Sequence, residues 1–580
     1  MQGTENRTKT LVILILAVII GVIYLLSLFL AYPEFQDTRL IDPLAEINSL
    51  FPLYYLAIAL TALLGLGCLI WRIENKYLHI LLLLMFAVML WFTPFYLAGF
   101  VRNPDGPWHV GVAMQMPQVL GGDPVAFSSY ALTHPGSFIY HYTFLETIDI
   151  EPTSYINILF PLLFLLLFFL LCYLLISRIF NGKVALLSML IAIPGLHYIV
   201  IHPSPQAVAL LLMLTTLLLL TKRGATAKII AIMAIIAIII ITHPITPLIL
   251  SIFLAAALLT TIGYSRRIGR DQVALASMLI FCLGGWFAWY VFYPAAPWVV
   301  PWEERLEILY RIMIPGDSAV PALMGEPFIY GSIRMLNRGV YILYAAAAIL
   351  GILYTAARTY YQERSISNWL SKLGGLHPGE VFMALSIPLL LLLSFLLAGI
   401  TPGLVGRGLI FIILALSCII ASVTVRLYRS GINKRIINSV VMVVVLFLTL
   451  TSPIVAYSVD AYASFPMSEG AGVEFLATEV PLEEKIIVMD WPYQIALYKP
   501  SSLKQTKFHA LSHSKEVPDL TKIQPDLIVF RNTSYYATAM SGDLSFENNR
   551  YWEQLAFAES NKYDKIYSCS TFEVYFKHKE

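Results

Sequence analysis

The sequence predicts a polytopic α-helical membrane protein with a small α/β domain at its C-terminal end. Hydrophobic residues make up 58% of the 580 residues and charged residues only 13%, whereas soluble domains carry roughly 25% charged residues. About thirteen apolar runs come close to the twenty residues that a helix needs to cross a bilayer. After Ser458, prolines, acids and polar residues return and continue to the end of the chain.

Composition also excludes several classes of protein. A net charge of +2, with basic residues spread from loop to loop, gives no basis for a nucleic-acid partner. The five cysteines form neither a disulfide framework nor a CxxC metal site, because Cys68, Cys172, Cys282 and Cys418 lie in apolar runs and only Cys569 is in a polar region. The sequence has no Walker loop, GxGxxG, HExxH or GxSxG motif.

The apolar runs define the predicted membrane helices. The first run exceeds the roughly 7–15 residues of a signal-peptide core and no small-residue cleavage pattern follows it, so we expect a retained helix that anchors the chain. Pro203, Pro205 and Pro244 mark either tight hairpins or kinks inside longer helices, and the loop charges favour hairpins. The predicted spans are 11–32, 51–71, 78–98, 155–177, 184–202, 205–221, 227–242, 244–263, 271–293, 338–357, 379–400, 404–425 and 436–457.

Loop charge predicts the orientation. With hairpins at both proline sites, the loops alternate between basic and nearly base-free, and basic loops are typical of the cytoplasmic side. We therefore expect a multi-pass plasma-membrane protein with a cytoplasmic N-terminus and an outward C-terminal domain. The transmembrane domain covers 1–457, with outer loops 99–154 and 294–337, and the extracytoplasmic domain covers 458–580.

Two soluble regions have recognisable patterns. Residues 301–312 place apolar side chains at helical spacing beside tryptophans, which predicts an amphipathic helix on the bilayer surface; a solvated connector with an aromatic belt is the alternative. The C-terminal region predicts a helix at 471–478 and strands at 485–490, 527–530 and 567–576, typical of a small α/β sandwich.

The first candidate site lies in the outer loop 99–154. Asp105 stands among two prolines and a glycine just after a predicted membrane helix. A carboxylate at the rim of a membrane cavity is partly desolvated, which raises its pKa toward the range of a general base. His109, four residues on, shares a face with Asp105 if the backbone is helical. The alternative is a helix N-cap at Asp105 followed by an interfacial anchor at Trp108 and His109.

Four more outward residues are candidates for binding. His202 and His243 each stand at the outer end of a predicted helix directly before a proline, and both a ligand-binding role and an interfacial anchor fit them. Arg338 and Arg407 lie at outer helix ends, where arginine is disfavoured. Contact with a lipid phosphate explains them, and so does pairing with an outer-loop acid such as Glu326.

Several of these segments together resemble a known family. They are Asp105-x-x-x-His109, Tyr130, the run from His134 to His141, the His-Pro-Ser-Pro-Gln sequence at 202–206 and Gly-Arg-Gly at 406–408. With the outward C-terminal domain that ends in a strand, they resemble the GT-C class glycosyltransferases, integral-membrane enzymes that use polyprenyl-phosphate-linked sugars, and especially their archaeal multi-spanning members.

The resemblance implies an inverting sugar transfer in which a loop aspartate acts as general base on the acceptor hydroxyl. Asp105 matches that aspartate, and His109 would bind donor phosphate, hold a metal or orient Asp105. Donor phosphate contacts fall to Arg407, Arg338, His243 and His202, and substrate contacts to Trp108, His134, Tyr140 and Gln206. Asp123 and Asp149 are distant further aspartates of the same loop.

The implied partners are a polyprenyl (dolichyl) phosphate sugar donor, a glycan, lipid or protein acceptor, and the bilayer. No cofactor is assigned, and a divalent metal remains open. Asp490-Trp491-Pro492-Tyr493 differs from the WWDYG-type motif of the oligosaccharyl-transferring members, so protein N-glycosylation is not implied. A transporter or flippase of lipid-linked sugars and a non-catalytic membrane scaffold are the alternative functions.

Overall fold

The structure is a computed structural model of the chain. It describes residues 2–37, 50, 52–97, 105–121, 128–196, 201–221, 226–264, 269–292, 328–363, 377–398, 403–428, 433–460, 467–480, 486–489, 507–509, 526–531, 563–569 and 572–577.

Each predicted membrane run overlaps a helix, although the run 184–202 is helical only to Gly195 and the run 78–98 is divided between two helices, α4 and the short α5 (Thr93–Leu97). These helices are α1 (Gln2–Asp37), α3 (Pro52–Ile70), α4 (Lys76–Trp91), α11 (Phe160–Ile179), α12 (Gly182–Gly195), α13 (Pro205–Leu220), α14 (Thr226–Thr242), α15 (Thr246–Tyr264), α16 (Arg270–Phe292), α19 (Phe328–Glu363), α21 (Pro378–Ala398), α22 (Gly403–Leu427) and α23 (Lys434–Asp460). In the described part of the chain, seven helices are long and apolar enough to cross a membrane, and six apolar helices are shorter. The chain is thus multi-pass by length and composition, while the number of spans stays a prediction.

The chain breaks its helices at both His-Pro sites, as the hairpin prediction requires. Helix α12 ends at Gly195 and α13 begins only at Pro205, where the Ser204 hydroxyl accepts a hydrogen bond from the backbone amide of Ala207 at 3.2 Å. Helix α14 ends at Thr242 and α15 begins at Thr246. A proline in a first helical turn loses no intrahelical bond, so both sequences start a new helix at little cost.

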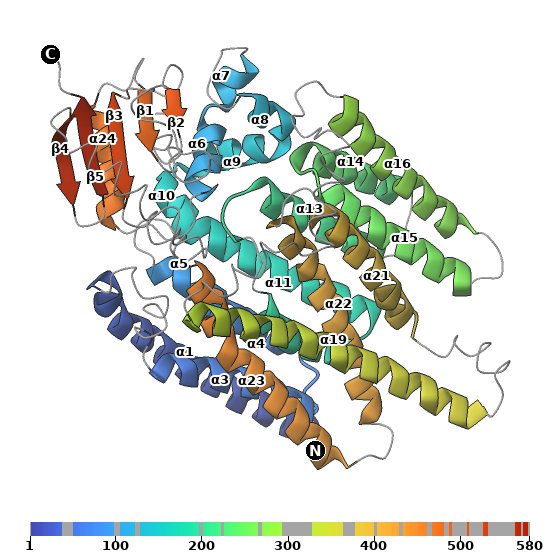
Figure 1. Ribbon diagram of the computed structural model, residues 1–580. Helices are drawn as coiled ribbons and strands as arrows, with labels where there is room; N and C mark the ends of the chain where they lie inside the picture. Colours follow the sequence, from blue (N-terminus) through green and yellow to red (C-terminus); the bar gives the residue numbers. More distant parts are fainter. Residues whose placement is uncertain are drawn as a thin grey trace.

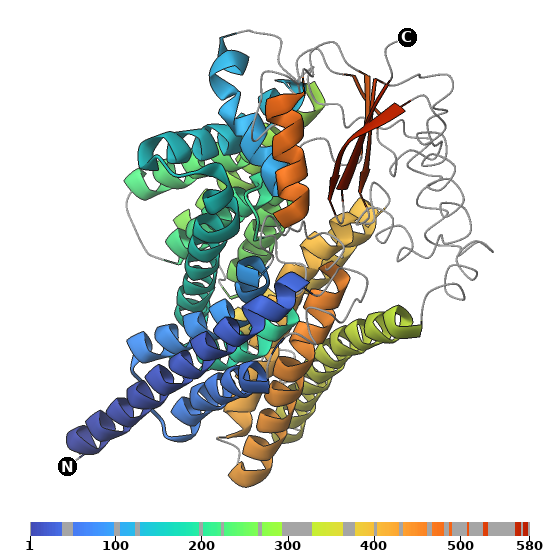
Figure 2. The same ribbon diagram turned by 90° about the vertical axis from the view of Figure 1, so that its left-hand side faces the viewer.

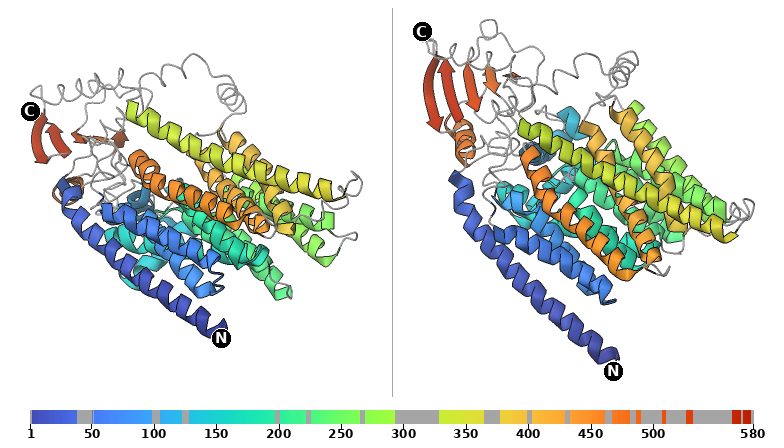
Figure 3. Two further views of the ribbon diagram at one scale, coloured as in Figure 1. Left: turned by 90° about the horizontal axis from the view of Figure 1, so that it is seen from below. Right: turned by 60° about the horizontal axis from the view of Figure 1, so that its bottom comes forward.

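The long helices form a bundle with a buried apolar core. Helices α1, α3, α23 and α19 lie side by side along one face (Figure 3). Helices α11, α12 and α22 are the inner ones, α21 packs against α22, and α15 packs against α21. Within the bundle, Phe164, Phe168 and Phe169 of α11 are at most 1% exposed. Burial of whole phenylalanine side chains contributes roughly 1.5–3 kcal/mol each, which fixes α11 at the centre.

The predicted outer loop 99–154 is helical over most of its described length. It contains α6 (Asp105–Met114), α7 (Met116–Leu120), α8 (Ser128–Thr133) and α9 (Pro135–Ile148), and α10 (Pro152–Ser154) leads through a π-helical turn, η1 (Tyr155–Leu159), into α11; the short α5 (Thr93–Leu97) precedes the loop. Helices α6 to α9 share a small core of their own, which includes Val112, Met116 and Phe138. They sit at the same end of the molecule as the sheet (Figures 1 and 2).

The C-terminal region contains α24 (Met467–Glu479) and a five-stranded sheet of order β2-β1-β3-β5-β4. Strands β1 (Ile486–Met489), β2 (Lys507–His509) and β3 (Leu527–Arg531) are parallel, and β5 (Phe572–Lys577) pairs antiparallel with β3 and with β4 (Tyr563–Cys569).

The predicted helix at 471–478 and strands at 485–490 and 527–530 are confirmed. The single terminal strand predicted at 567–576 is wrong: β4 ends at Cys569 and β5 begins at Phe572, and the two strands pair antiparallel. The amphipathic segment 301–312 lies outside the described residues.

Candidate functional site

The loop that carries Asp105 begins helix α6. Pro107 lies in its first turn, where a missing amide hydrogen costs little, so the helix continues through His109. The backbone condition for Asp105 and His109 to share a face is therefore met. The side chain of Asp105 lies outside the described part of the structure.

The first turn of α6 presses against two other elements. A Cβ added at Gly106 would lie 3.0 Å from Cγ2 of Ile156 in η1, 3.7 Å from Cβ of His202 and 3.7 Å from Cδ of Pro203. The contact with Ile156 is tighter than nearly all real Cβ contacts, so a larger residue at this position would require Ile156 to shift. The residue next to Asp105 is thus held against the turn that precedes α13.

Aromatic rings extend this contact. The His109 ring stacks on that of His202, with centroids 6.1 Å apart and planes at 14°. Trp108 lies 5.0 Å from His109, and Phe138 of α9 lies 6.1 Å from it. His109 is 5% exposed and His202 is 9% exposed, so two imidazoles from distant parts of the sequence share one buried site.

A third histidine joins them from α9. The hydroxyl of Tyr155 lies 2.7 Å from Nδ1 of His141, which is fully buried. Burial lowers the pKa of His141 to about 3; the hydrogen-bonding backbone of Ser204 opposes this shift and nearby His202 adds to it. His141 is therefore neutral at physiological pH. We call His109, His141 and His202 the histidine cluster.

The π-helical turn explains why Tyr155 faces α9. Pro161 has no amide hydrogen, so the regular bond to the residue four positions earlier cannot form, and the preceding turn widens into η1. Single π turns of this kind occur frequently at functional sites.

His134 and His243 stand at the start of α9 and just after the end of α14, two helices that pack against each other. Nδ1 of His243 accepts a hydrogen bond from the backbone amide of Thr246 at 3.2 Å and lies 2.8 Å from its hydroxyl. Since a backbone amide can only donate, this imidazole carries no proton on Nδ1. His134 caps α9, is 2% exposed and lies 6.1 Å from the ring of Tyr290 in α16.

Two buried polar atoms near these histidines are unsatisfied among the described residues. They are Oε1 of Gln206, in the first turn of α13, and Oγ of Ser137, in the first turn of α9. A buried polar atom without a partner costs about 1–3 kcal/mol, so such atoms normally have water or a ligand nearby. This end of the bundle has unused hydrogen-bonding capacity.

The other predicted site residues are spread out. Tyr140 is 41% exposed on the outer face of α9. Arg407 lies in the first turns of α22, as predicted, but the predicted helix-end position of Arg338 is wrong, because α19 already begins at Phe328. The side chains of both arginines are outside the described residues. Asp149 is exposed and ends α9 in a left-handed conformation (φ 53°), so its position has a structural reason. Asp123 lies outside the described part.

His141 and Tyr155 are site residues that the sequence did not predict. One signal was present, because His141 follows His134 by two helical turns and continues the buried spacing of Ser137, Phe138 and Leu145. The contact between His141 and Tyr155 joins α9 to η1, so the local spacing of apolar residues could not predict it.

Metal binding finds no support in the described part of the chain, where no three His, Cys, Asp or Glu side chains are grouped so that they could hold an ion. The three imidazoles of the histidine cluster do not converge on one point. The histidine cluster instead places imidazole groups that can form hydrogen bonds beside the start of α6.

Comparisons with known proteins gave one kind of match. No family model and no curated protein matches the sequence. Among solved structures, the oligosaccharyltransferase of Archaeoglobus fulgidus, tethered to an acceptor peptide with an NVT sequon, is 13% identical, with 87% of this chain and 74% of that chain covered at a TM-score of 0.49. Its complex with an inhibitory peptide and a dolichol-phosphate is 13% identical, with 87% and 74% covered at a TM-score of 0.43.

These structural neighbours are archaeal GT-C glycosyltransferases, the class that the sequence resembles. Their identities and TM-scores are too low to transfer a residue role, a substrate or a partner to this chain. The segment from Asp490 to Tyr493, which differs from the WWDYG-type motif, lies outside the described residues, so that prediction stays untested.

Proposed function

We propose that this protein is a GT-C class glycosyltransferase that moves a hexosyl or pentosyl group from a polyprenyl phosphate to an acceptor at the outer face of the plasma membrane. The observation that carries the proposal is the packing of the first turn of α6 against the turn at His202, with Gly106 as the contact. It brings the Asp105 position to a buried group of neutral and stacked imidazoles at one end of an apolar bundle.

This arrangement suits an inverting transfer. Asp105 is the general base that removes the proton from the acceptor hydroxyl, which attacks the anomeric carbon as the C–O bond to the lipid phosphate breaks. A positioned base contributes about 10²–10⁴-fold to the rate. His109 orients Asp105, and His202 and His243 bind donor phosphate together with Arg338 of α19 and Arg407 in the first turns of α22.

Substrate contacts fit the surroundings of the cluster. Gln206 has an acceptor oxygen without a partner among the described residues, which suits a sugar hydroxyl. The ring of Trp108 lies 5.0 Å from that of His109, tilted by 35°, and exposed Tyr140 and buried His134 border the site. The proposed topology has thirteen spans, a cytoplasmic N-terminus and the sheet with α24 on the outside.

The test is Asp105→Asn in purified full-length protein. Radiolabelled dolichyl-phosphate hexose and pentose are supplied with a membrane fraction as acceptor source, and released dolichyl phosphate is measured. We expect release to fall about 10²–10⁴-fold, because an amide cannot take the acceptor proton.

Asp149→Asn is the matched control. Asp149 belongs to the same predicted outer loop but is exposed, and asparagine also adopts its left-handed conformation readily. Its release rate should equal that of the wild type. Equal rates for both variants would show that Asp105 is not the base, and an unchanged thermal midpoint would rule out misfolding as the cause of any loss.

A further inference from the structure

A cavity of about 440 Å³ lies between α11, α13, α15, α21 and α22. It is at the end of these helices remote from the histidine cluster. Arg178 in the last turn of α11 and Thr221 just after α13 line it, whereas the cluster adjoins the first turns of both helices. A volume in the range of roughly 300–1,000 Å³ is typical of small-molecule sites.

The interior of the cavity is apolar and leaves no threonine hydroxyl in need of a hydrogen bond from a ligand. Most lining side chains are apolar, among them Leu175, Ile176, Leu214, Leu217, Phe253 and Phe382. The hydroxyls of the lining threonines are already satisfied within their own helices: that of Thr260 donates to the Ala256 carbonyl at 2.7 Å, and that of Thr221 to the Leu218 carbonyl at 2.7 Å. Apolar cavities exclude water and accept hydrocarbon.

Among the described residues that line the cavity, Arg178 is the one cation. Arg178 is exposed, and it makes no ion pair with any residue that the structure describes. The start of α21 lies directly beside the end of α11, since a Cβ at Gly379 would come within 2.6 Å of Cγ2 of Ile179.

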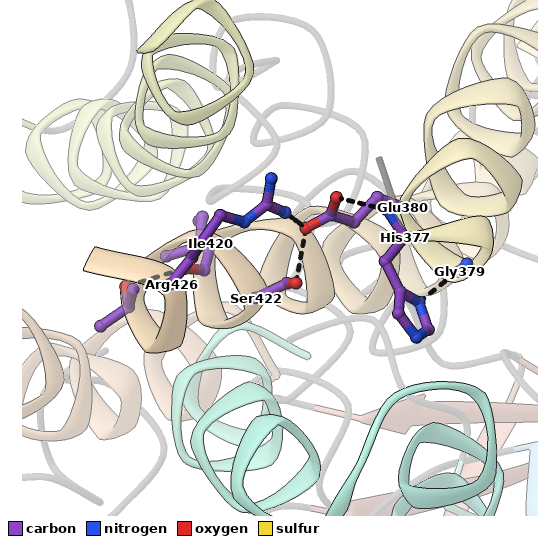
Figure 4. Close-up of polar contacts among 7 residues, drawn as sticks. His377, Gly379, Glu380, Ile420, Ser422 and Arg426 are labelled. Carbon is purple, nitrogen blue, oxygen red and sulfur yellow. Dashed lines mark hydrogen bonds and ion pairs between the residues drawn. The ribbon is translucent and has the colours of Figure 1, made fainter. Parts of the chain in front are cut away.

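Glu380 is a buried acid in the first turn of α21, and both of its carboxylate oxygens already accept hydrogen bonds (Figure 4). Its Oε1 accepts from the Arg426 guanidinium and from the Ser422 hydroxyl at 2.6 Å, and its Oε2 accepts from the His377 amide at 3.1 Å. Glu380 therefore does not neutralise Arg178, and the charge at the rim matches an anion.

We propose that this cavity binds one hydrocarbon chain of an anionic membrane lipid, whose phosphate is bound by Arg178. The guanidinium fork matches phosphate oxygens, and the cavity offers the chain a dry apolar site inside the bundle. The lipid comes from the leaflet at the Arg178 end, predicted to be cytoplasmic. This site goes beyond the proposed sugar transfer and is separate from the donor site, because the histidine cluster lies at the other end of α11 and α13.

The test uses the purified full-length protein and phosphatidylglycerol with a diazirine in its acyl chain. After photolysis, crosslinked residues are mapped by mass spectrometry. We expect crosslinks on lining residues of α11, α15 and α22, with competition by unlabelled phosphatidylglycerol. Crosslinks confined to lipid-facing residues of the bundle would overturn the proposal, as would displacement of the probe by polyprenyl phosphate but not by phosphatidylglycerol, because the occupant would then be the donor tail.

Variants sharpen this test. Ala257→Trp fills the cavity, whereas Leu259→Trp is a matched control on the same helix, since Leu259 is 52% exposed on the lipid side. Only Ala257→Trp should remove the lining crosslinks. Arg178→Ala should reduce the preference for phosphatidylglycerol over phosphatidylcholine about five-fold, as loss of about 1 kcal/mol predicts, and Arg178→Lys should restore part of it. An unchanged preference in Arg178→Ala would overturn the head-group assignment, and the wild-type map decides the cavity even if Ala257→Trp fails to fold.

Discussion

Polar side chains are buried at both ends of the bundle, but they are satisfied to different degrees. Glu380 receives hydrogen bonds from three groups, and Arg426 and Ser422 join α21 to α22 through it (Figure 4). Near the histidine cluster, the Gln206 oxygen and the Ser137 hydroxyl have no partner among the described residues. A saturated network holds helices together, whereas an unsaturated one has hydrogen-bonding capacity left for a ligand.

The largest expected effect on stability comes from breaking the saturated end. Glu380→Gln removes the negative charge of the carboxylate to which Arg426 and Ser422 both donate hydrogen bonds, and Glu380 is only 6% exposed. Because the Arg426 side chain is 33% exposed and keeps some access to water, we expect a loss of about 2–3 kcal/mol, less than for a fully buried pair. The measurement is denaturant unfolding in detergent.

The control for this prediction is Glu74→Gln. Glu74 is paired with Lys183 at 2.8 Å, but its side chain is 72% exposed, so the change should cost less than about 0.5 kcal/mol. Similar losses in both variants would contradict a structural role for the Glu380 network.

The second effect is pH dependence at the histidine cluster. The unfolded state takes up a proton on His141 near pH 6.5, and the folded state only near pH 3. Below pH 6.5 the unfolded state therefore binds more protons, and stability falls as pH falls, by up to about 1.4 kcal/mol per unit. Unfolding free energies at pH 7, 6 and 5 should show a steeper slope for the wild type than for His141→Gln. Parallel slopes would mean that His141 is not buried as a neutral group.

These two sites differ in how far the sequence predicted them. The apolar runs fixed the positions of the long helices, because a span near twenty residues is a local signal. His202 was predicted because it stands directly before a proline at a helix end, and His109 because it lies four residues after Asp105. The Glu380 network was not predicted, although His377 and Glu380 stand three residues apart at a helix start, the spacing of a capping box. Its partners on α22, and Tyr155 beside His141, depend on packing between distant helices.

A smaller effect tests the bond between η1 and α9. Tyr155→Phe removes the hydroxyl that lies 2.7 Å from Nδ1 of His141 and keeps the ring in place. One neutral hydrogen bond contributes about 1 kcal/mol, so the unfolding free energy should fall by that amount. A loss near zero would indicate that His141 finds another partner, and the wild-type pH slope would then be retained in this variant.

The smallest expected change in stability, with a large change in function, is Gln206→Leu. Its oxygen is buried and unmatched in the described structure, so a side chain of similar volume without polar atoms should alter the unfolding free energy by less than about 1 kcal/mol. If that oxygen binds a sugar hydroxyl, release of dolichyl phosphate should fall about ten-fold, equivalent to about 1.4 kcal/mol. A variant that loses stability but keeps its rate of dolichyl phosphate release would contradict this prediction. Gln206 would then stabilise the packing of α13, as Glu380 stabilises α21 and α22, and its unpaired oxygen would not indicate a binding site.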